Sequence, residues 1–244
     1  MTIQTLAIVL RSTDYREADR IVTLLTPDLG KIGAVARGVR SSRRRFGGCL
    51  QSCTLLRVDL DTTRNALWSL KRVDLERHYP TLMSRLKRIT LAGEMTELVR
   101  ELSAEDVPDP ELFRTLNDAL VVLDRRSINE TVVLPAFALR LISELGLPPG
   151  IHGCDVCGRS VPEGRATLFD ARHGAVRCRN CGGGRYRLSP AVRARWQACF
   201  EPQWADLVSE ASLTSADFAW DAVLAMLRHH AGKPLLSSHG ALAE

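Results

Sequence analysis

The sequence lacks any apolar run of the roughly 20 residues that a membrane-spanning helix needs. Its first residues, MTIQTLAIVLRSTD, also lack the basic start and the small-residue cleavage site of a secretory signal. These absences argue against a helical membrane protein and against secretion. We therefore expect a soluble cytoplasmic protein with no membrane partner.

Signatures of the common enzyme classes are missing too. No GxxxxGK[ST] phosphate loop, GxGxxG fingerprint, GxSxG elbow or HExxH motif occurs in the chain. An acidic trio of Asp14, Glu17 and Asp19 could hold the metal ion of a nuclease. Three arginines alternate with these acids, and clusters of both signs are usually surface ion pairs. We expect no enzymatic activity and no small-molecule substrate.

Acidic residues are absent between Asp28 and Asp59, a stretch that carries seven lysines and arginines. Residues 1–80 hold 14 basic and 8 acidic side chains, whereas the remainder holds 19 and 20, so the net charge of +5 is concentrated near the N-terminus. Five arginines fall within nine residues of the segment 37–48, here called the basic segment: Arg37, Arg40, Arg43, Arg44 and Arg45. A field of one sign attracts phosphates, which predicts binding to a nucleic-acid backbone.

Aromatic residues are scarce in the same region, where Tyr15, Phe46 and Trp68 are the only ones before Tyr79. Three rings, of which one or two are expected in a core, cannot stack many unpaired bases. Contacts should therefore be made mainly to phosphates. A surface that holds strands by their backbones leaves base edges free to pair, so strand annealing needs no catalytic residue.

Residues 1–79 alternate short apolar runs with turn signals and show no long helical period, which is typical of strands. The pattern predicts five strands, at 6–11, 20–26, 31–36, 52–60 and 66–73, with a longer loop at 40–48. Five short strands and one extended loop favour a barrel of OB type, a fold that commonly binds nucleic acid. An SH3-like barrel would give a similar pattern.

The period becomes helical after Tyr79, and cap, proline and glycine signals recur along the rest of the chain. Helices are predicted after Pro80 and at 110–125, 129–145, 190–200 and 215–230. The expected fold is thus α+β and multidomain. It consists of an OB-type barrel over 1–79, a helical domain over 80–150 and 185–236, an inserted four-cysteine zinc-finger module over 151–184, and a flexible tail over 237–244.

Two CxxC pairs, separated by twenty residues, carry the most specific signal: Cys154, Cys157, Cys178 and Cys181. Two such turns offer four thiolates to one tetrahedral ion, which predicts one structural Zn²⁺ with no open ligand position. Disulfides or a redox pair would leave the doubled spacing unexplained. Seven arginines surround this cysteine module, with Glu163 and Asp170 as close acids. They indicate either a solvated face or a second phosphate-binding surface.

The N-terminal motifs resemble those of the RecO family of bacterial recombination and repair proteins. The likeness is densest over Val9–Arg20, Leu24–Lys31, Ala36–Arg40 and Arg45–Gly48. The order of barrel, helical domain and CxxC module resembles the family over the whole length. The N-terminal motifs are specific, whereas the helical part is not.

This resemblance implies a DNA-binding mediator that binds single- and double-stranded DNA and anneals complementary strands. With RecR, it would help RecA replace single-stranded DNA-binding protein on DNA, in a cytoplasmic, nucleoid-associated setting. The resemblance assigns the four cysteines to zinc, and since some family members lack them, the metal should support folding. It assigns DNA contacts to Lys31, Arg37, Arg40, Arg43, Arg44 and Arg45.

Two other functions stay open from the residues alone. The first is a zinc-ribbon adaptor that binds RNA or a protein partner through its basic N-terminal segment. The second, ranked last because motifs are absent, is a nuclease that uses the acidic trio.

Overall fold

The computed structural model describes residues 2–39, 46, 49–63, 67–232 and 235. The chain forms two compact units, residues 1–125 and 126–244. The expected helical domain spans this division, because its helices fall into both units. The predicted tail, 237–244, lies outside the described residues. Within the described part, no helix is both long and apolar enough to cross a bilayer.

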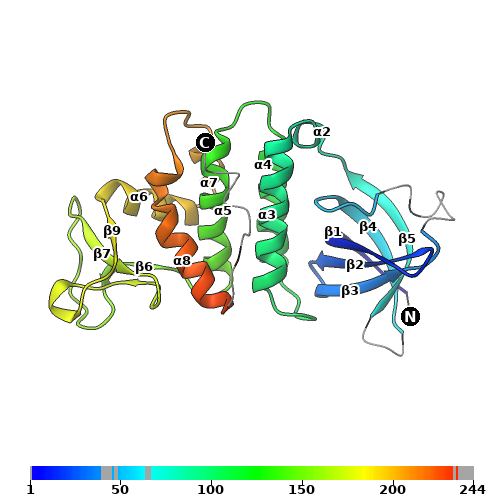
Figure 1. The fold of residues 1–244 in the computed structure, drawn as a ribbon, viewed down its shortest axis with the longest axis horizontal. Coiled ribbons are helices and arrows are strands. Elements are labelled where there is room, and N and C mark those ends of the chain that lie inside the picture. Colours follow the sequence, from blue (N-terminus) through cyan, green and yellow to red (C-terminus); the bar gives the residue numbers. More distant parts are fainter. Residues whose placement is uncertain (1, 40–45, 47–48, 64–66, 233–234, 236–244) are drawn as a thin grey trace. The chain divides into compact units, whose positions relative to one another are not determined.

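The first unit begins with a five-stranded sheet that closes into a barrel (Figure 1). Its strands are β1 (Thr2–Tyr15), β2 (Asp19–Thr26), β3 (Gly30–Ala36), β4 (Leu55–Asp61) and β5 (Trp68–Arg77). Their order around the barrel is β1-β2-β3-β5-β4. Strands β3 and β5 pair in parallel, whereas the other recorded pairs of the barrel are antiparallel. The prediction of five strands is confirmed.

Strand β1 is longer than predicted because it serves two partners. Its first half, Thr2–Ile8, pairs with β4, and its second half, Ile8–Tyr15, pairs with β2. The register shifts between Val9 and Arg11, as at a β-bulge. A bulge bends a strand and increases its twist, which lets β1 pass from one neighbour to the other and close the barrel. Short-range periodicity cannot reveal this double pairing.

The barrel interior is filled by alternate aliphatic side chains such as Val22, Leu24, Val58 and Leu60, none of which is exposed. Phe46 joins this core with only 1% of its surface exposed, although it belongs to the basic segment. Burial of so large a ring contributes on the order of 2–3 kcal/mol. The chain is therefore attached to the barrel at this end of the basic segment.

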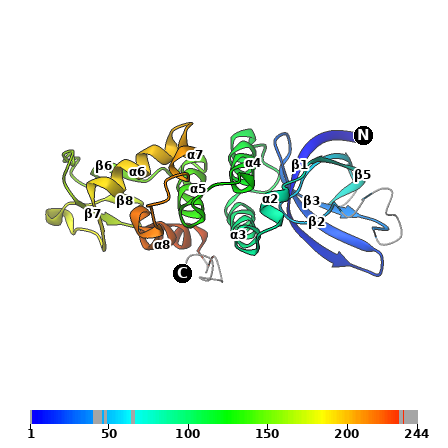
Figure 2. The ribbon, with the colours of Figure 1, turned by 90° about the horizontal axis from the view of Figure 1, so that it is seen from above.

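Three helices complete the first unit: α2 (Pro80–Met83), α3 (Leu86–Leu102) and α4 (Pro110–Asp124). Helices α3 and α4 lie side by side in both ribbon views (Figures 1 and 2). Asp109 caps α4 as predicted, since its carboxylate accepts from Leu112 N at 2.9 Å. The buried Arg88 guanidinium donates to Leu123 O at 2.8 Å and Arg125 O at 2.6 Å. It thereby satisfies carbonyls at the end of α4.

Lys31 joins the barrel to α3. Its side chain is buried, and Nζ donates to Arg100 O at 2.6 Å and to Ser103 O at 2.7 Å. These carbonyls lie in the last turn of α3 and just beyond it, where helical partners run out and a cation is favoured. Next to Lys31, a Cβ on Gly30 would stand 1.9 Å from Val107 O, so only glycine allows this approach.

The second unit packs helices against a small sheet (Figure 1). The helices are α5 (Glu130–Glu144), α6 (Pro190–Phe200), α7 (Trp204–Leu207) and α8 (Trp220–Ala231). The sheet has the order β6 (Gly150–Cys154), β8 (Ala175–Val176), β7 (Thr167–Asp170) and β9 (Tyr186–Leu188). Helix α5 ends as predicted at Gly146, whose φ is 78°. Because β9 pairs with β7, the sheet of the cysteine module extends past residue 184.

The predicted helix at 215–230 is two helices. A 3₁₀ turn, η2 (Ser215–Phe218), precedes α8, and Ala219 between them adopts φ 47°. The carbonyl of Phe218 accepts from the indole Nε1 of buried Trp196 at 2.7 Å. Because this carbonyl points to a side chain of α6, it is not available for a continuous helix. A tertiary contact here overrides a local helical pattern.

We expect Lys31→Met to lower the free energy of unfolding by about 2–4 kcal/mol, because it leaves two carbonyls near the end of α3 without their cation. Urea unfolding followed by circular dichroism measures the change. Lys71→Met is the matched control, since Lys71 is exposed and makes only a surface ion pair with Asp61 at 3.4 Å. Equal losses in the two variants would contradict the proposed role of Lys31.

Candidate metal centre and nucleic-acid interface

The sheet of the cysteine module brings the two CxxC pairs together. Strand β6 ends at Cys154, and Cys154 pairs in register with Val176 of β8, two residues before Cys178. Asp155 N also donates to Val176 O at 3.0 Å. Backbone pairing alone thus fixes residues far apart in sequence side by side.

Each pair sits on a tight turn closed by glycine. Gly158 N donates to Cys154 O at 2.9 Å, and Gly183 N donates to Cys178 O at 3.0 Å. Gly158 has φ 69° and Gly182, after Cys181, has φ 102°. Side chains are disfavoured in this left-handed region, so the glycines that follow both CxxC pairs are required by the turns.

The four sulfur atoms all lie within 4.8 Å of one another. The Sγ atoms of Cys157 and Cys178 are 3.8 Å apart. An ion bound tetrahedrally with metal–sulfur bonds of about 2.3 Å would separate its sulfurs by about 3.8 Å. Among the described residues, this is the cluster of metal-binding side chains that the structure brings together. The four cysteines could therefore hold one metal ion.

The cysteines shift the pKa values of one another's thiols in opposite directions. Hydrogen bonds from the backbone of Cys178 and Cys157 lower the pKa of Cys154 to about 6. Hydrogen bonds with the Cys178 and Cys157 side chains raise the pKa of Cys181 to about 12. One thiolate is favoured and a further one is opposed, because hydrogen bonds with the neighbouring thiols stabilise the protonated form of Cys181. A divalent cation reverses that opposition, so the donor set fits a metal.

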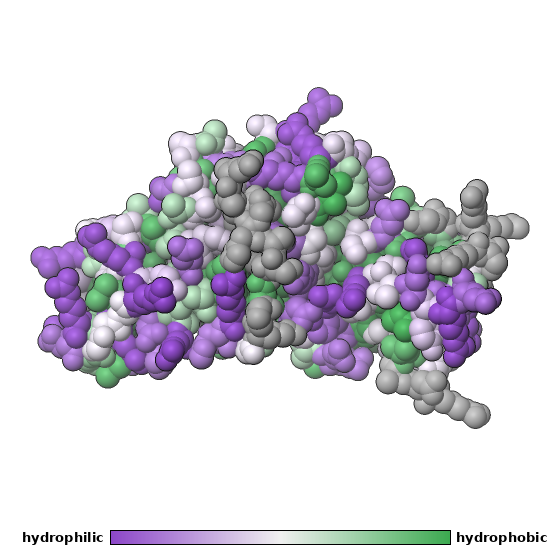
Figure 3. Space-filling view, in the orientation of Figure 1, coloured by the Kyte–Doolittle hydropathy of each residue, from purple (hydrophilic) through white to green (hydrophobic). Residues whose placement is uncertain are grey.

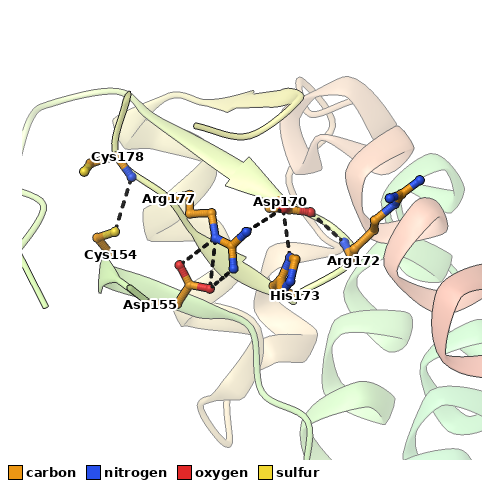
Figure 4. Close-up of polar contacts among 7 residues, drawn as sticks. All are labelled: Cys154, Asp155, Asp170, Arg172, His173, Arg177 and Cys178. Atoms are coloured by element: carbon orange, nitrogen blue, oxygen red, sulfur yellow. Dashed lines mark hydrogen bonds and ion pairs between the residues drawn. The ribbon is translucent and has the colours of Figure 1, made fainter. Parts of the chain in front are cut away.

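The four cysteines that could hold an ion, Cys154, Cys157, Cys178 and Cys181, are here called the cage, and an ion-pair network lies beside it (Figure 4). The Arg177 guanidinium donates to both carboxylate oxygens of Asp155, at 2.8–3.2 Å, and more weakly to Asp170 at 3.5 Å. The hydrogen bond from Arg177 holds the pKa of Asp155 below its usual value. The pair therefore persists at neutral pH and is lost only in acid, as Asp155 becomes protonated. Arg177 is committed to this network and is not a surface cation.

Asp155 is the residue that sequence analysis misses in this module. It lies inside the first CxxC pair, directly after Cys154. This position next to the cysteines was the sequence signal that could have identified it. Burial would raise the pKa of Asp170, the other acid of the network, but hydrogen bonds from His173 and from Arg172 N lower it below its ordinary value. The seven arginines of the module are consequently not equivalent.

Arg193 of α6 attaches the cysteine module to the helices. Its guanidinium donates to the carbonyls of Ile151 at 3.1 Å, Pro162 at 3.2 Å and Arg165 at 3.1 Å. Trp196 and Phe169 of β7 form a T-shaped aromatic pair, with ring centroids 5.1 Å apart and planes at 86°. The module is thus positioned by one planar cation and one aromatic pair as well as by its sheet.

The predicted DNA contacts fall into three groups. Lys31 is buried against α3, so the structure removes it from any contact surface: its ammonium is already held by two carbonyls. Arg37 follows β3 and is exposed. The remaining predictions lie outside the described residues: Arg40, Arg43, Arg44 and Arg45.

The described residues that flank these four arginines are anchored to the barrel. Val39 packs against the barrel core, and Phe46 is part of it. Gly38 N also donates to the Asp19 carboxylate at 2.9 Å. The acidic trio is not gathered into a metal cluster: Asp19 serves this turn, and Asp14 accepts from Arg20 Nε at 2.9 Å.

Known proteins match this sequence over nearly the whole chain. Residues 1–79 match the family described as recombination protein O N terminal, and residues 83–239 match recombination protein O C terminal. The DNA repair protein RecO of Anaeromyxobacter sp. (strain K) is 39% identical over 233 residues, 93% of this chain and 91% of that protein. That of Myxococcus xanthus is 40% identical over 186 residues, 76% and 75% of the two chains. That of Geobacter metallireducens is 35% identical over 240 residues, 96% and 94%.

We expect Cys157→Ser to release the metal and destabilise the second unit, because ligation free energy is also folding free energy. Cys157 is exposed, so its thiol contributes little by packing and a large loss of stability would report on the metal. Metal content by mass spectrometry and thermal unfolding measure the effect. Cys49→Ser is the control, since Cys49 lies against the barrel and outside the cage. A Cys157→Ser protein with full metal content would refute the cage.

Proposed function

The chain belongs to the recombination protein O (RecO) family, and from this premise we propose that it is a DNA-binding mediator of recombination. Family membership supports a role in DNA repair and recombination. The finer proposal is that the protein binds single- and double-stranded DNA, anneals complementary strands and, with RecR, promotes loading of RecA onto DNA covered by single-stranded DNA-binding protein. We place it in the cytoplasm, associated with the nucleoid.

One observation carries this proposal: an acid-free, arginine-rich segment attached at both sides to a closed barrel. The strand order β1-β2-β3-β5-β4 and the parallel contact of β3 with β5 suit a barrel of OB type. OB folds commonly bind oligonucleotides on one face and in the connecting loops. Arg37 and the four arginines between Val39 and Phe46 belong to such a connection. A rigid scaffold with a basic connection is a typical arrangement for binding phosphates.

The aromatic residues of the barrel favour phosphate contacts over base stacking. Phe46 is buried in the core, Trp68 packs partly against it, and Tyr15 is 39% exposed with Arg16 over its ring. Within the described part of the barrel, a row of exposed rings for successive bases is therefore absent. Strands held by their phosphates keep their base edges free to pair. Neutralised phosphates also repel a second strand less, so binding alone promotes annealing.

We propose that the four cysteines hold one Zn²⁺ and that this ion is structural. Bound zinc would supply a tetrahedral crosslink between the two turns. Cys154, Cys157, Cys178 and Cys181 fill every position of such a site and leave none for water or substrate. Together with the missing enzyme motifs, this supports a protein that binds nucleic acid without breaking bonds.

The alternative functions are less well supported. A zinc-ribbon adaptor that binds RNA or a protein through the basic segment would share the barrel and the cage, but relatives named as DNA repair proteins favour DNA. A nuclease would need clustered metal ligands besides the cysteines. Asp14 and Asp19 instead make separate local contacts.

We expect Arg43, Arg44 and Arg45 replaced together by Ala to weaken binding of single-stranded DNA and slow annealing. Loss of three phosphate contacts should reduce the slope of log affinity against log salt by about 2. Fluorescence anisotropy with a labelled oligonucleotide at several salt concentrations gives the slope, and hybridisation of complementary strands gives the rate.

The matched control removes three charges from strand β5 of the same barrel, by Lys71→Ala, Arg72→Ala and Arg77→Ala. Asp61 and Asp74 already pair with two of these cations, so their loss should change the salt slope little. Equal effects of the two triple variants would place the DNA contact outside the basic segment. An unchanged annealing rate in the arginine variant would overturn the annealing proposal.

The mediator role makes a separate prediction. Binding to single-stranded DNA coated with single-stranded DNA-binding protein should persist, and addition of RecR with this protein should shorten the lag before RecA forms filaments. RecA ATP hydrolysis on coated DNA measures the lag, with uncoated DNA as the control. A protein that binds bare DNA but leaves the lag unchanged would be an adaptor and not a mediator.

A further inference from the structure

A hollow of about 790 Å³ opens in the second unit between the cysteine module and α8. One wall is the glycine turn that follows Cys181, and another is the last part of α8, with Ala225 and Arg228. The hollow is here called the arginine hollow, after the side chains that line it: Arg172, Arg179, Arg185 and Arg228. None of these residues belongs to the barrel or to the basic segment.

Among the described lining residues, the only acid, Asp170, is already neutralised. Asp170 accepts from Arg172 N at 3.0 Å, from His173 Nδ1 at 2.9 Å and from Arg177 at 3.5 Å (Figure 4). These contacts use both carboxylate oxygens. The arginine hollow therefore has a net positive lining.

Three of the arginines carry uncompensated charge. Arg172, Arg179 and Arg185 are exposed, and no acidic group of the described residues pairs with their guanidinium groups. Figure 4 shows the Arg172 side chain pointing away from the Asp155–Arg177 pair. Hydrophilic side chains cover much of the visible face of the cysteine module, at the left of Figure 3. Guanidinium groups that lack an acidic partner are available to an anion.

The shape of the wall suits a backbone ligand. Gly182, Gly183 and Gly184 present no side chains to the hollow, and a Cβ added at Gly182 would meet no other atom within 4 Å. Arg179 also lines a second hollow, of about 400 Å³, on the same module. That hollow contains the other surface arginines of the module: Arg159, Arg165 and Arg187. Positive charge thus continues from one hollow into the next.

We propose that the arginine hollow is a second site for a nucleic-acid backbone, separate from the basic segment. This inference rests on the proposed function, since a second strand-binding site has a use in a protein that anneals DNA. One chain would then have two places to hold a strand. The arginines would bind phosphates through their paired N–H donors, and the glycine wall would let the sugar-phosphate chain approach closely. Annealing would then bring together two strands held by different parts of one molecule.

An acidic peptide is the competing ligand, and the structure favours nucleic acid. Arginines continue around the module through two hollows, which suits a long polymer with one charge per repeat. A short acidic segment would use a few of these charges only. The described lining contains two rings, those of Tyr186 and His229. Arg185 lies over the Tyr186 ring, with 5.9 Å from guanidinium carbon to ring centroid, so a row of rings for several bases is not offered. Binding should therefore be insensitive to sequence.

The test uses the full zinc-loaded chain and counts the binding sites for a short non-complementary oligonucleotide, an octamer of deoxythymidine. Wild type should bind two strands per chain. Arg172→Ala with Arg185→Ala should remove one site and reduce the summed salt slope by about 1.4, for two phosphate contacts. Arg179 is left intact because it lies between two cage cysteines. Metal content and thermal unfolding verify the fold, and Arg172→Gln with Arg185→Gln serves if the alanine variant is unstable.

The control variant, Arg125→Ala with Arg126→Ala, removes two exposed charges that line neither hollow. Loss of a site in the control as well, or two sites retained in the hollow variant, would overturn the inference. So would displacement of the oligonucleotide from the hollow by a glutamate octapeptide of equal charge at lower concentration. A basic segment that does not bind DNA would give a different result. The Arg43, Arg44 and Arg45 variant would then still bind two strands, whatever the hollow variant does.

Discussion

Backbone carbonyls at helix ends are the constraint on which both units depend. Helices α3, α4 and α6 end in extended backbone and not in a left-handed glycine, so their last carbonyls need donors from elsewhere. Lys31 supplies them for α3 and Arg88 for α4. Arg140 of α5 supplies them for α6, donating to Cys199 O at 3.0 Å and Glu201 O at 2.9 Å. In each case a cation from a different element fixes how the helix packs.

This use of cations divides the basic residues into two populations. One is internal and contributes to the fold: Arg193, for example, holds loops of the cysteine module, and Arg177 balances the acids beside the cage. The other is exposed and gives the molecule its external field. Only the second population can meet phosphates. The net charge of +5 therefore says less about binding than the location of each guanidinium.

The cysteine module shows how strongly local pattern and tertiary pairing can agree. Spacing and glycines predict two tight turns, and the structure has them, with Gly158 and Gly182 in left-handed conformations. The four sulfurs meet because β6 and β8 pair, which the sequence does not indicate. Other predictions were limited by the same kind of contact. The double pairing of β1 lengthened a predicted strand, and the Trp196–Phe218 hydrogen bond interrupted a predicted helix.

The amino-acid sequence alone determined the four cysteines that could hold a metal ion, the strand count of the barrel, the caps of α4 and α5 and the family, because these depend on residue types at short, fixed spacings. The tertiary structure alone decided that Lys31 is buried, that Arg177 is neutralised and that Arg172, Arg179 and Arg185 line one hollow. A charged side chain carries the same letter whether it binds a carbonyl inside the protein or faces solvent. Only packing between distant segments, which sets desolvation and partners, distinguishes the two.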